Sequence, residues 1–145
     1  MEYQRFGNTI YARIDRGEEV LDALRRLCLA EGVKLAHVSA LGATDDFTVG
    51  VFDVDTKVYH SLDFAGAHEI VSLTGTVSTM NGEYYAHLHM SAANAEGSVR
   101  GGHLNRARIS ATCELVLTVT DGAVERERSE EVGLNLFRFE DGKRA

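Results

Sequence analysis

The dipeptide Asn81-Gly82 lies between two stretches that read as strands, 68–79 and 84–91. Asn and Gly adopt the left-handed backbone of a two-residue hairpin turn most readily, so this pair is the strongest short-range hairpin signal in the chain. The two stretches are therefore expected to pair antiparallel. Because successive strand residues point to opposite faces of a sheet, this pairing also decides which side chains share a face.

The remaining patterns predict one helix and further strands. Residues 18–31 carry an apolar stripe at helical spacing, and Gly32 suits the position after the helix end. Residues 109–120 are almost continuously apolar and are expected to form a central strand that is buried on both faces. Other strands are expected at 3–14 (with a turn or bulge at Gly7-Asn8), 33–43, 47–54 and 57–64 as a hairpin, 98–104, 123–128 and 134–139. The prediction is an α+β fold, a mostly antiparallel sheet with one main helix, in a single domain over residues 1–145.

Charge and composition argue against several classes of protein. The 145-residue chain has a formal net charge of −7 at pH 7, whereas proteins that bind DNA by themselves usually carry a basic face. No stretch is apolar for long enough to span a membrane, and the N-terminus lacks the apolar segment of a signal peptide. Cys28 and Cys113 lie in apolar patterns, which predicts buried thiols in a cytoplasmic protein.

Three of the six histidines lie close together in the sequence, at 87, 89 and 103. His87 and His89 would share one face of the strand after the turn. His103 follows Gly101 and Gly102, whose missing Cβ atoms allow another backbone to approach closely. Three imidazoles can hold zinc or another divalent transition metal and leave a coordination position open. The alternative is that these histidines form hydrogen bonds at an interface between subunits.

Four further residues are candidates for the same site. Glu114 lies in an apolar segment, where burying a charge is costly without a partner. It would act as a general acid/base or metal ligand, or equally as the partner of an arginine in an ion pair. In an enzyme, Arg100 or Arg106 would bind a substrate carboxylate, and Tyr85 would donate a hydrogen bond to a metal-bound ligand. The favoured alternative is that these arginines are solvated at the surface or form ion pairs between subunits, and that Tyr85 is a buried aromatic residue.

Four segments, in their order and spacing, resemble the PPC domain, the plant-and-prokaryote conserved family: VLDALRRLCLAEGVKLAHVSALGA, HEIVSLTGTVS, HLHMSAANAEGSVRGGHL and ATCELVLTV. The resemblance implies a compact domain that assembles as a homotrimer. The family is often labelled DNA-binding because plant members carry AT-hooks, but a chain without proline has no such hook. His87, His89 and His103 resemble the prokaryotic branch, for which a zinc ion on three histidines is expected. The fold is also similar to that of acetolactate decarboxylase, a zinc enzyme.

The sequence therefore predicts a homotrimeric metal-binding protein of undefined activity, with zinc or a similar ion on His87, His89 and His103. One alternative is a metal-dependent lyase or hydrolase that acts on a small carbonyl or carboxylate compound, with Glu114 as its catalytic residue. The other is a DNA-binding or regulatory protein, for which the acidic charge makes direct contact with DNA doubtful.

Overall fold

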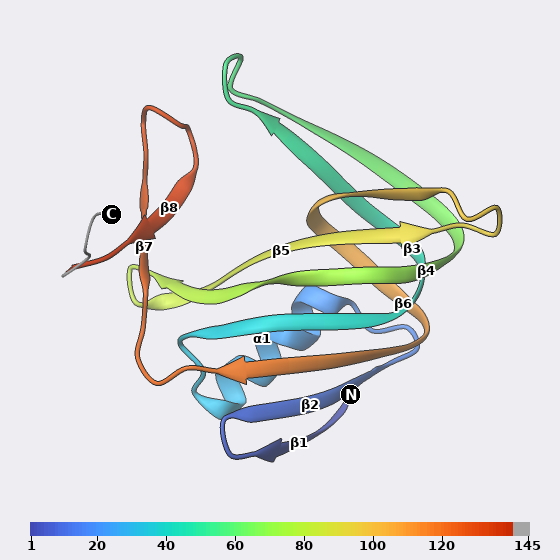
Figure 1. Ribbon diagram of the computed structural model, residues 1–145, viewed down its shortest axis with the longest axis horizontal. Helices are drawn as coiled ribbons and strands as arrows, with labels where there is room; N and C mark the ends of the chain where they lie inside the picture. The colour runs from blue at the N-terminus through green and yellow to red at the C-terminus, as the bar shows by residue number, and fades with distance from the viewer. Residues whose placement is uncertain (141–145) are drawn as a thin grey trace.

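The computed structural model of the chain describes residues 1–140 and contains one helix and eight strands (Figure 1). In chain order these are β1 Glu2–Phe6, β2 Thr9–Asp15, α1 Val20–Glu31, β3 Ala36–Asp53, β4 Val58–Met80, β5 Glu83–Ala93, β6 Val99–Val119, β7 Glu125–Arg128 and β8 Asn135–Arg138. Within these residues, every strand pair except β4–β7 is antiparallel. The predicted α+β class is confirmed.

The four long strands pair in a closed circuit. β3 pairs with both β4 and β6, and β5 also pairs with both β4 and β6. β2 and β1 extend the sheet from the other end of β6. β7 joins β4 through a single parallel pair, Thr79 with Glu125, and β8 pairs only with β7 among the described strands.

Helix α1 covers one face of the sheet and contacts β5 and β6 (Figure 1). Its buried stripe consists of Val20, Ala23, Leu24, Leu27 and Cys28. The Glu19 carboxylate caps the helix by accepting from the Asp22 amide, and its other oxygen accepts from the Ala107 amide of β6 at 3.0 Å. The cap therefore fixes where the helix starts and also ties it to the sheet. Gly32 adopts the predicted left-handed conformation, with φ 63°.

Several predicted strands are longer than expected. The segments 33–43 and 47–54 form the single strand β3, and 57–64 and 68–79 form β4. Likewise, 98–104 and 109–120 merge into β6. The register of β3 shifts at two bulges, between Ala40 and Gly42 and between Thr44 and Asp46. A bulge bends a strand without ending its pairing, so the polar and glycine residues that suggested breaks mark bends instead. Gly7-Asn8 forms a turn between β1 and β2.

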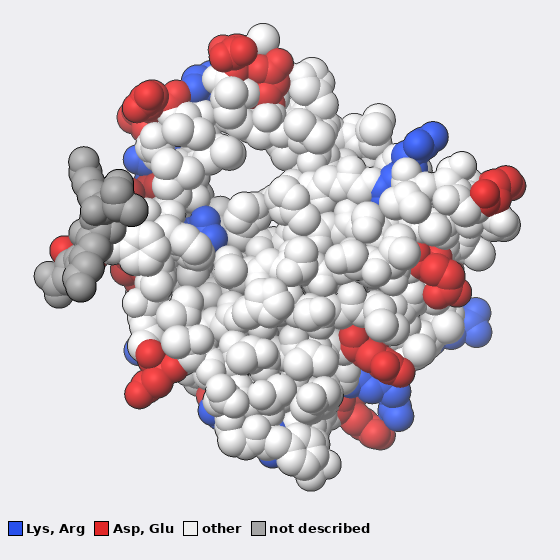
Figure 2. Space-filling model, viewed as in Figure 1, with Lys and Arg blue, Asp and Glu red and all other residues white. Residues whose placement is uncertain are grey.

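The expectation that residues 109–120 are buried on both faces is wrong. Cys113, Leu115 and Leu117 are buried, whereas Glu114 between the first two and Thr118 after the last are exposed. The reason is that α1 covers only one face of the sheet. The opposite face, seen in Figure 2, is largely free of charged side chains, which gather around its rim.

Two further features agree with the sequence. Cys28 and Cys113 are buried, and burial raises the pKa of each thiol to about 12. In the described part of the chain, no helix is both long and apolar enough to cross a membrane.

Candidate metal centre

Strand β5 holds the first two histidines. Asn81 and Gly82 form the predicted turn, with φ 55° and 78°, and β5 pairs antiparallel with β4 beyond it. This register places His87 opposite Thr76 and His89 opposite Thr74. The intervening Leu88 is 1% exposed and lies in the core. Both histidines therefore project from the face opposite to the core.

Strand β6 brings the third histidine to the same place. His103 pairs with His89 of β5 and with Gly50 of β3. A Cβ atom on Gly102 would lie 2.6 Å from the Gly50 carbonyl oxygen, and one on Gly101 would lie 2.6 Å from that of Met90. The close backbone approach predicted at the two glycines is confirmed. It allows β6 to lie between β3 and β5 at the position of His103.

The three imidazoles form one cluster. Their ring centroids are 5.2 Å apart for His87 and His89, 5.1 Å for His87 and His103, and 5.6 Å for His89 and His103. One nitrogen from each ring lies within 4.8 Å of the other two. A point therefore exists within about 2.8 Å of all three nitrogens, and zinc–nitrogen bonds are about 2.0–2.1 Å long. Side-chain shifts of less than about 1 Å would let the three rings hold such an ion.

The electrostatics of the cluster favour neutral imidazoles. Burial is the main cause that lowers the pKa of His87 from 6.5 to about 4, and positive charge on His103, Arg126 and His89 adds to the effect. Burial, followed by charge on His89, also lowers the pKa of His103. A metal ion binds the neutral ring, so these two rings need not lose a proton at neutral pH to become ligands.

The depressed pKa of His87 predicts an acid sensitivity of the metal-free protein. Between pH 6.5 and about 4 the unfolded state binds more protons at this ring than the folded state, so stability falls as the pH falls through that window. Because the ring is only partly buried, the expected loss is about 1 kcal/mol. In urea unfolding with a chelator present, His87→Gln should lose less stability than wild type between pH 7 and 4.5. His60→Gln, at an exposed position, is the control, and equal losses in wild type and His87→Gln would contradict the prediction.

Glu114 is not brought to the histidines within the chain. It is exposed, and in the strand register its backbone lies opposite Arg13 of β2 and Leu41 of β3. His103 lies in a different part of β6, the part whose backbone pairs with β5. The expectation of a buried carboxylate at this position is wrong, since residues on alternate sides of β6 face the core and the open face. A role for Glu114 within the metal centre of the same subunit therefore has no support from its position.

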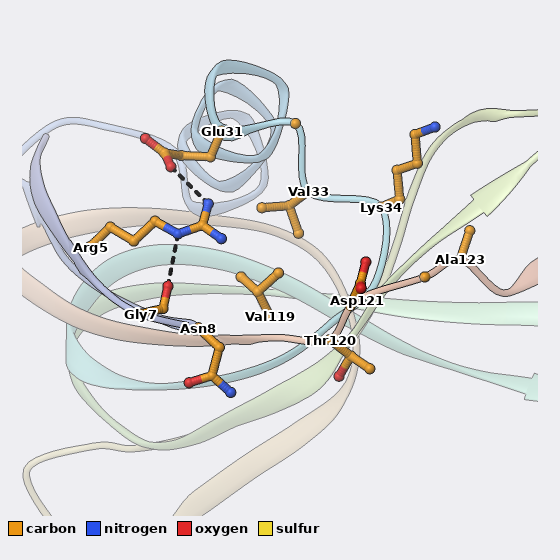
Figure 3. Close-up of a pocket in the computed structure, with 12 residues that line it drawn as sticks. Arg5, Gly7, Asn8, Glu31, Val33, Lys34, Val119, Thr120, Asp121 and Ala123 are labelled. Atoms are coloured by element: carbon orange, nitrogen blue, oxygen red, sulfur yellow. Dashed lines mark hydrogen bonds and ion pairs between the residues drawn. The ribbon is translucent and has the colours of Figure 1, made fainter.

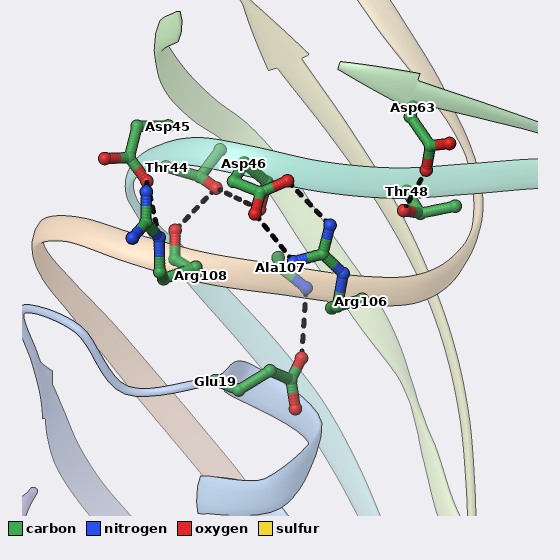
Figure 4. A network of polar contacts seen from close by, with 9 residues as sticks. All are labelled: Glu19, Thr44, Asp45, Asp46, Thr48, Asp63, Arg106, Ala107 and Arg108. Carbon is green, nitrogen blue, oxygen red and sulfur yellow. Dashed lines mark hydrogen bonds and ion pairs between the residues drawn. The ribbon is translucent and has the colours of Figure 1, made fainter. Parts of the chain in front are cut away.

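Arg106 is already engaged by a carboxylate of its own subunit. Its two terminal nitrogens donate to the two oxygens of Asp46 at 2.7 and 2.6 Å, and Arg108 pairs with Asp45 at 2.9 Å (Figure 4). The Asp46 carboxylate has a lowered pKa, chiefly because of the hydrogen bonds from Arg106. These pairs hold β6 against β3 and leave Arg106 poorly placed to bind a substrate.

Arg100 and Tyr85 have different surroundings. Arg100 is exposed on β6, opposite Ala92 of β5. Tyr85 is partly buried on the same face of β5 as His87, and its ring lies against the guanidinium of Arg126 at 4.8 Å. Arg126 was missed by the sequence interpretation, because the segment ERER (125–128) is typical of a solvated edge strand. The only sequence signal for a special role of Arg126 is the alternation of acidic and basic residues in this segment.

Two cavities lie away from the histidines. The larger, of about 680 Å³, is bounded by the β1–β2 turn, the end of α1 and residues 119–123 (Figure 3). Within it Arg5 pairs with Glu31 at 3.0 Å and donates to the Gly7 carbonyl oxygen. The second, of about 470 Å³, lies over β1, β2 and β6 and includes Glu114 and Tyr11 in its lining. The described residues that line these two cavities include no group of three metal-ligating side chains.

Comparisons with known proteins agree with the fold. The family model described as the Plants and Prokaryotes Conserved (PCC) domain matches residues 1–121. A Bacteroides thetaiotaomicron protein, provisionally named DNA-binding, superposes with a TM-score of 0.93 at 30% identity, covering 96% of this chain and 97% of the other. A metal-containing protein from Archaeoglobus fulgidus gives a TM-score of 0.85 at 30% identity, over 95% and 97% of the two chains.

A third solved structure is similar over nearly the same length. It is a plant- and prokaryote-conserved protein from Pyrococcus horikoshii, with a TM-score of 0.83 at 30% identity, covering 95% of this chain and 94% of the other. No curated protein matches the sequence.

Proposed function

Because the chain belongs to the Plants and Prokaryotes Conserved (PCC) domain family, we propose that it is a metal-binding member with a single divalent transition-metal ion on His87, His89 and His103. The observation that carries the proposal is the convergence of three imidazole nitrogens, within 4.8 Å of one another, from two strands that meet at Gly101 and Gly102. The metal-containing relative from Archaeoglobus fulgidus supports it.

Zinc is the ion that we favour. Three neutral imidazoles with room for a further ligand are typical of catalytic zinc sites, although cobalt, nickel and iron accept similar ligands. When bound, the ion would supply Lewis acidity for a carbonyl or carboxylate oxygen. The lowered pKa of His87 and of His103 favours binding at neutral pH.

Elemental analysis of protein purified without a histidine tag or chelator tests the proposal. We expect about one metal ion per chain in the wild type and none in the His87→Ala/His89→Ala variant, because one imidazole cannot hold the ion alone. His60→Ala, which removes an exposed histidine away from the cluster, should leave the metal content unchanged. A wild-type protein that takes up no metal even after reloading with zinc would overturn the proposal.

We also propose that the active form is a homotrimer in the cytoplasm. The helix-free face is poor in charge (Figure 2) and exposes apolar side chains, among them Tyr11 at 55% and Leu41 at 57%. Such a face is typical of a surface that is covered by another subunit. Two buried thiols suit a reducing compartment. Light scattering should give three times the chain mass of 15.9 kDa.

DNA binding is the weaker candidate, although one relative carries that provisional name. The net charge is −7, and the arginines nearest His103 in sequence include two that are paired with Asp45 and Asp46. Figure 2 shows basic side chains scattered among acidic ones at the rim of the face. A gel shift at low salt that disappears as salt is raised would support this candidate, and the absence of any shift at low salt would exclude it.

A further inference from the structure

Arg126 on β7 is a buried cation that lies on the same side of the sheet as the histidines. It is 7% exposed, and burial lowers the pKa of its guanidinium. The Tyr85 and Phe137 rings lie against the guanidinium, with their centroids 4.8 and 4.2 Å from its central carbon. Aromatic rings stabilise a cation by about 0.5–2 kcal/mol, which does not replace the hydration lost on burial.

Among residues 1–140, the hydrogen bonds of Arg126 go only to neutral oxygens. Nε donates to Ser78 Oγ at 2.8 Å, Nη1 to the Asn135 carbonyl oxygen at 2.9 Å and Nη2 to Thr76 Oγ1 at 3.3 Å. Guanidinium carries five N–H donors, so each terminal nitrogen retains one N–H beyond these bonds. No carboxylate oxygen of residues 1–140 forms an ion pair with it, whereas Arg106 and Arg108 each have an aspartate. Arg126 is thus a buried charge that lacks a counter-ion among the described residues.

The position of Arg126 relates it to the metal centre. Its partners Thr76 and Ser78 lie on β4 directly opposite His87 and Tyr85 of β5. Its charge is among those that lower the pKa of His87. In Figure 1, β7 and β8 stand across the end of the β4–β5 hairpin. The guanidinium and the three imidazoles therefore belong to one surface, built from β4, β5, β6 and β7.

We propose that Arg126 binds the carboxylate of a small ligand whose other oxygen coordinates the metal held by the three histidines. This inference rests on the proposed metal-binding function and adds the chemical class of the ligand. A guanidinium is suited to a carboxylate because its N–H groups match the two oxygens, and the attraction between the two charges is stronger in the low-dielectric surroundings of a buried group. The carboxylate would supply the counter-ion that Arg126 lacks. Arg126 would then take the role that the sequence suggested for Arg100 or Arg106.

The test uses the cobalt(II)-loaded full-length protein, because the visible spectrum of cobalt reports a change of ligand. Malonate is the probe, and its neutral diamide, malonamide, is the matched compound. We expect malonate to bind at least tenfold more weakly to Arg126→Gln than to wild type, with unchanged cobalt content, and malonamide not to distinguish the two. Arg126→Lys, which keeps the charge but loses the planar fork, should lie between them. Arg25→Gln, at an exposed arginine of helix α1, is the control and should bind malonate as wild type does.

The two proposals fail in different ways. If the wild type takes up cobalt but malonate leaves its spectrum unchanged, or binds equally to Arg126→Gln, the role of Arg126 is wrong and the metal site stands. If the wild type takes up no cobalt, the metal site is wrong, and malonate is then tested on the thermal unfolding of the metal-free proteins. A rise in Tm for wild type and Arg25→Gln but not for Arg126→Gln would still support an anion site at Arg126, and any other pattern would overturn it. If Arg126→Gln does not fold, Arg126→Lys replaces it in each comparison, and affinity equal to wild type overturns the proposal.

Discussion

Phe47→Ala is expected to lower the free energy of unfolding by about 3–5 kcal/mol. Phe47 is fully buried in β3, stacks on Phe64 at 4.9 Å and contacts the edge of the His68 ring at 5.1 Å. It lies just after the second bulge of β3, where the strand bends, and it pairs with Phe64 of β4 and Ala107 of β6. Removing the ring would leave a cavity at the bend, where three strands meet, and backbone hydrogen bonds limit how far they can close it.

Urea denaturation monitored by circular dichroism measures this loss. Phe6→Ala is the matched control, because the Phe6 side chain is 55% exposed in β1 and contacts Tyr11 edge-on. Its removal should cost about 1 kcal/mol or less. Similar losses in the two variants would mean that the bend is not a centre of packing.

Gly75→Ala should both destabilise the protein and weaken metal binding. Gly75 of β4 pairs with Leu88 of β5, and a Cβ atom on it would overlap the His87 carbonyl oxygen and lie 2.7 Å from Leu88 Cα. Both contacts are with backbone, so β5 must move to admit the methyl group. Overpacking of this kind costs about 1–3 kcal/mol or more. Because His87 is attached to the displaced segment, metal affinity should fall by about tenfold or more, as it does when supporting groups of a metal site are lost.

Gly66→Ala separates the clash from the general cost of replacing glycine. A Cβ atom on Gly66 would meet no atom within 4 Å, but its φ of 92° disfavours alanine. We expect a loss of about 1–2 kcal/mol without a change in zinc affinity, measured by competition with a chromogenic chelator. Retention of wild-type zinc affinity by Gly75→Ala would contradict the dependence of the site on this strand contact.

The sequence predicted the elements whose signals are local. The Asn81-Gly82 turn, the period of two along β5 and the apolar stripe of α1 each depend on a few neighbouring residues, and all three are confirmed. The grouping of His103 with the His-x-His pair followed from the adjacent Gly101 and Gly102 together with the resemblance to the PPC domain. The sequence did not reveal that β3 and β6 continue through bulges, because a polar or glycine residue within a strand reads as a break when its pairing partner is unknown.

The residues that the sequence misjudged depend on distant partners. An apolar neighbourhood suggested burial for Glu114, but only the sheet topology shows that its side of β6 is not covered by α1. The ion pair of Arg106 with Asp46 joins positions 60 residues apart in the sequence, and the hydrogen bond from Arg126 to Thr76 joins positions 50 residues apart. Such contacts are decided by strand order, which local patterns do not encode. Arg126 also lies beyond residues 1–121, the stretch that the family model matches.

Because β7 and β8 are joined to the rest of the sheet by little backbone pairing, we expect them to open more readily than the four long strands. β3, β4, β5 and β6 pair with one another along most of their lengths, whereas the strand pairing of β7 with β4 is limited to Thr79, and the side chain of Arg126 adds only its hydrogen bonds to Thr76 and Ser78 of β4. Local opening that detaches β7–β8 would break far fewer interactions than global unfolding does, so their amides should exchange with deuterium sooner than those of the four long strands. In the opened state the guanidinium of Arg126 moves away from the histidines together with β7, while the imidazoles stay with β5 and β6. The protein would then alternate between a metal centre with a fixed cation beside it and one without.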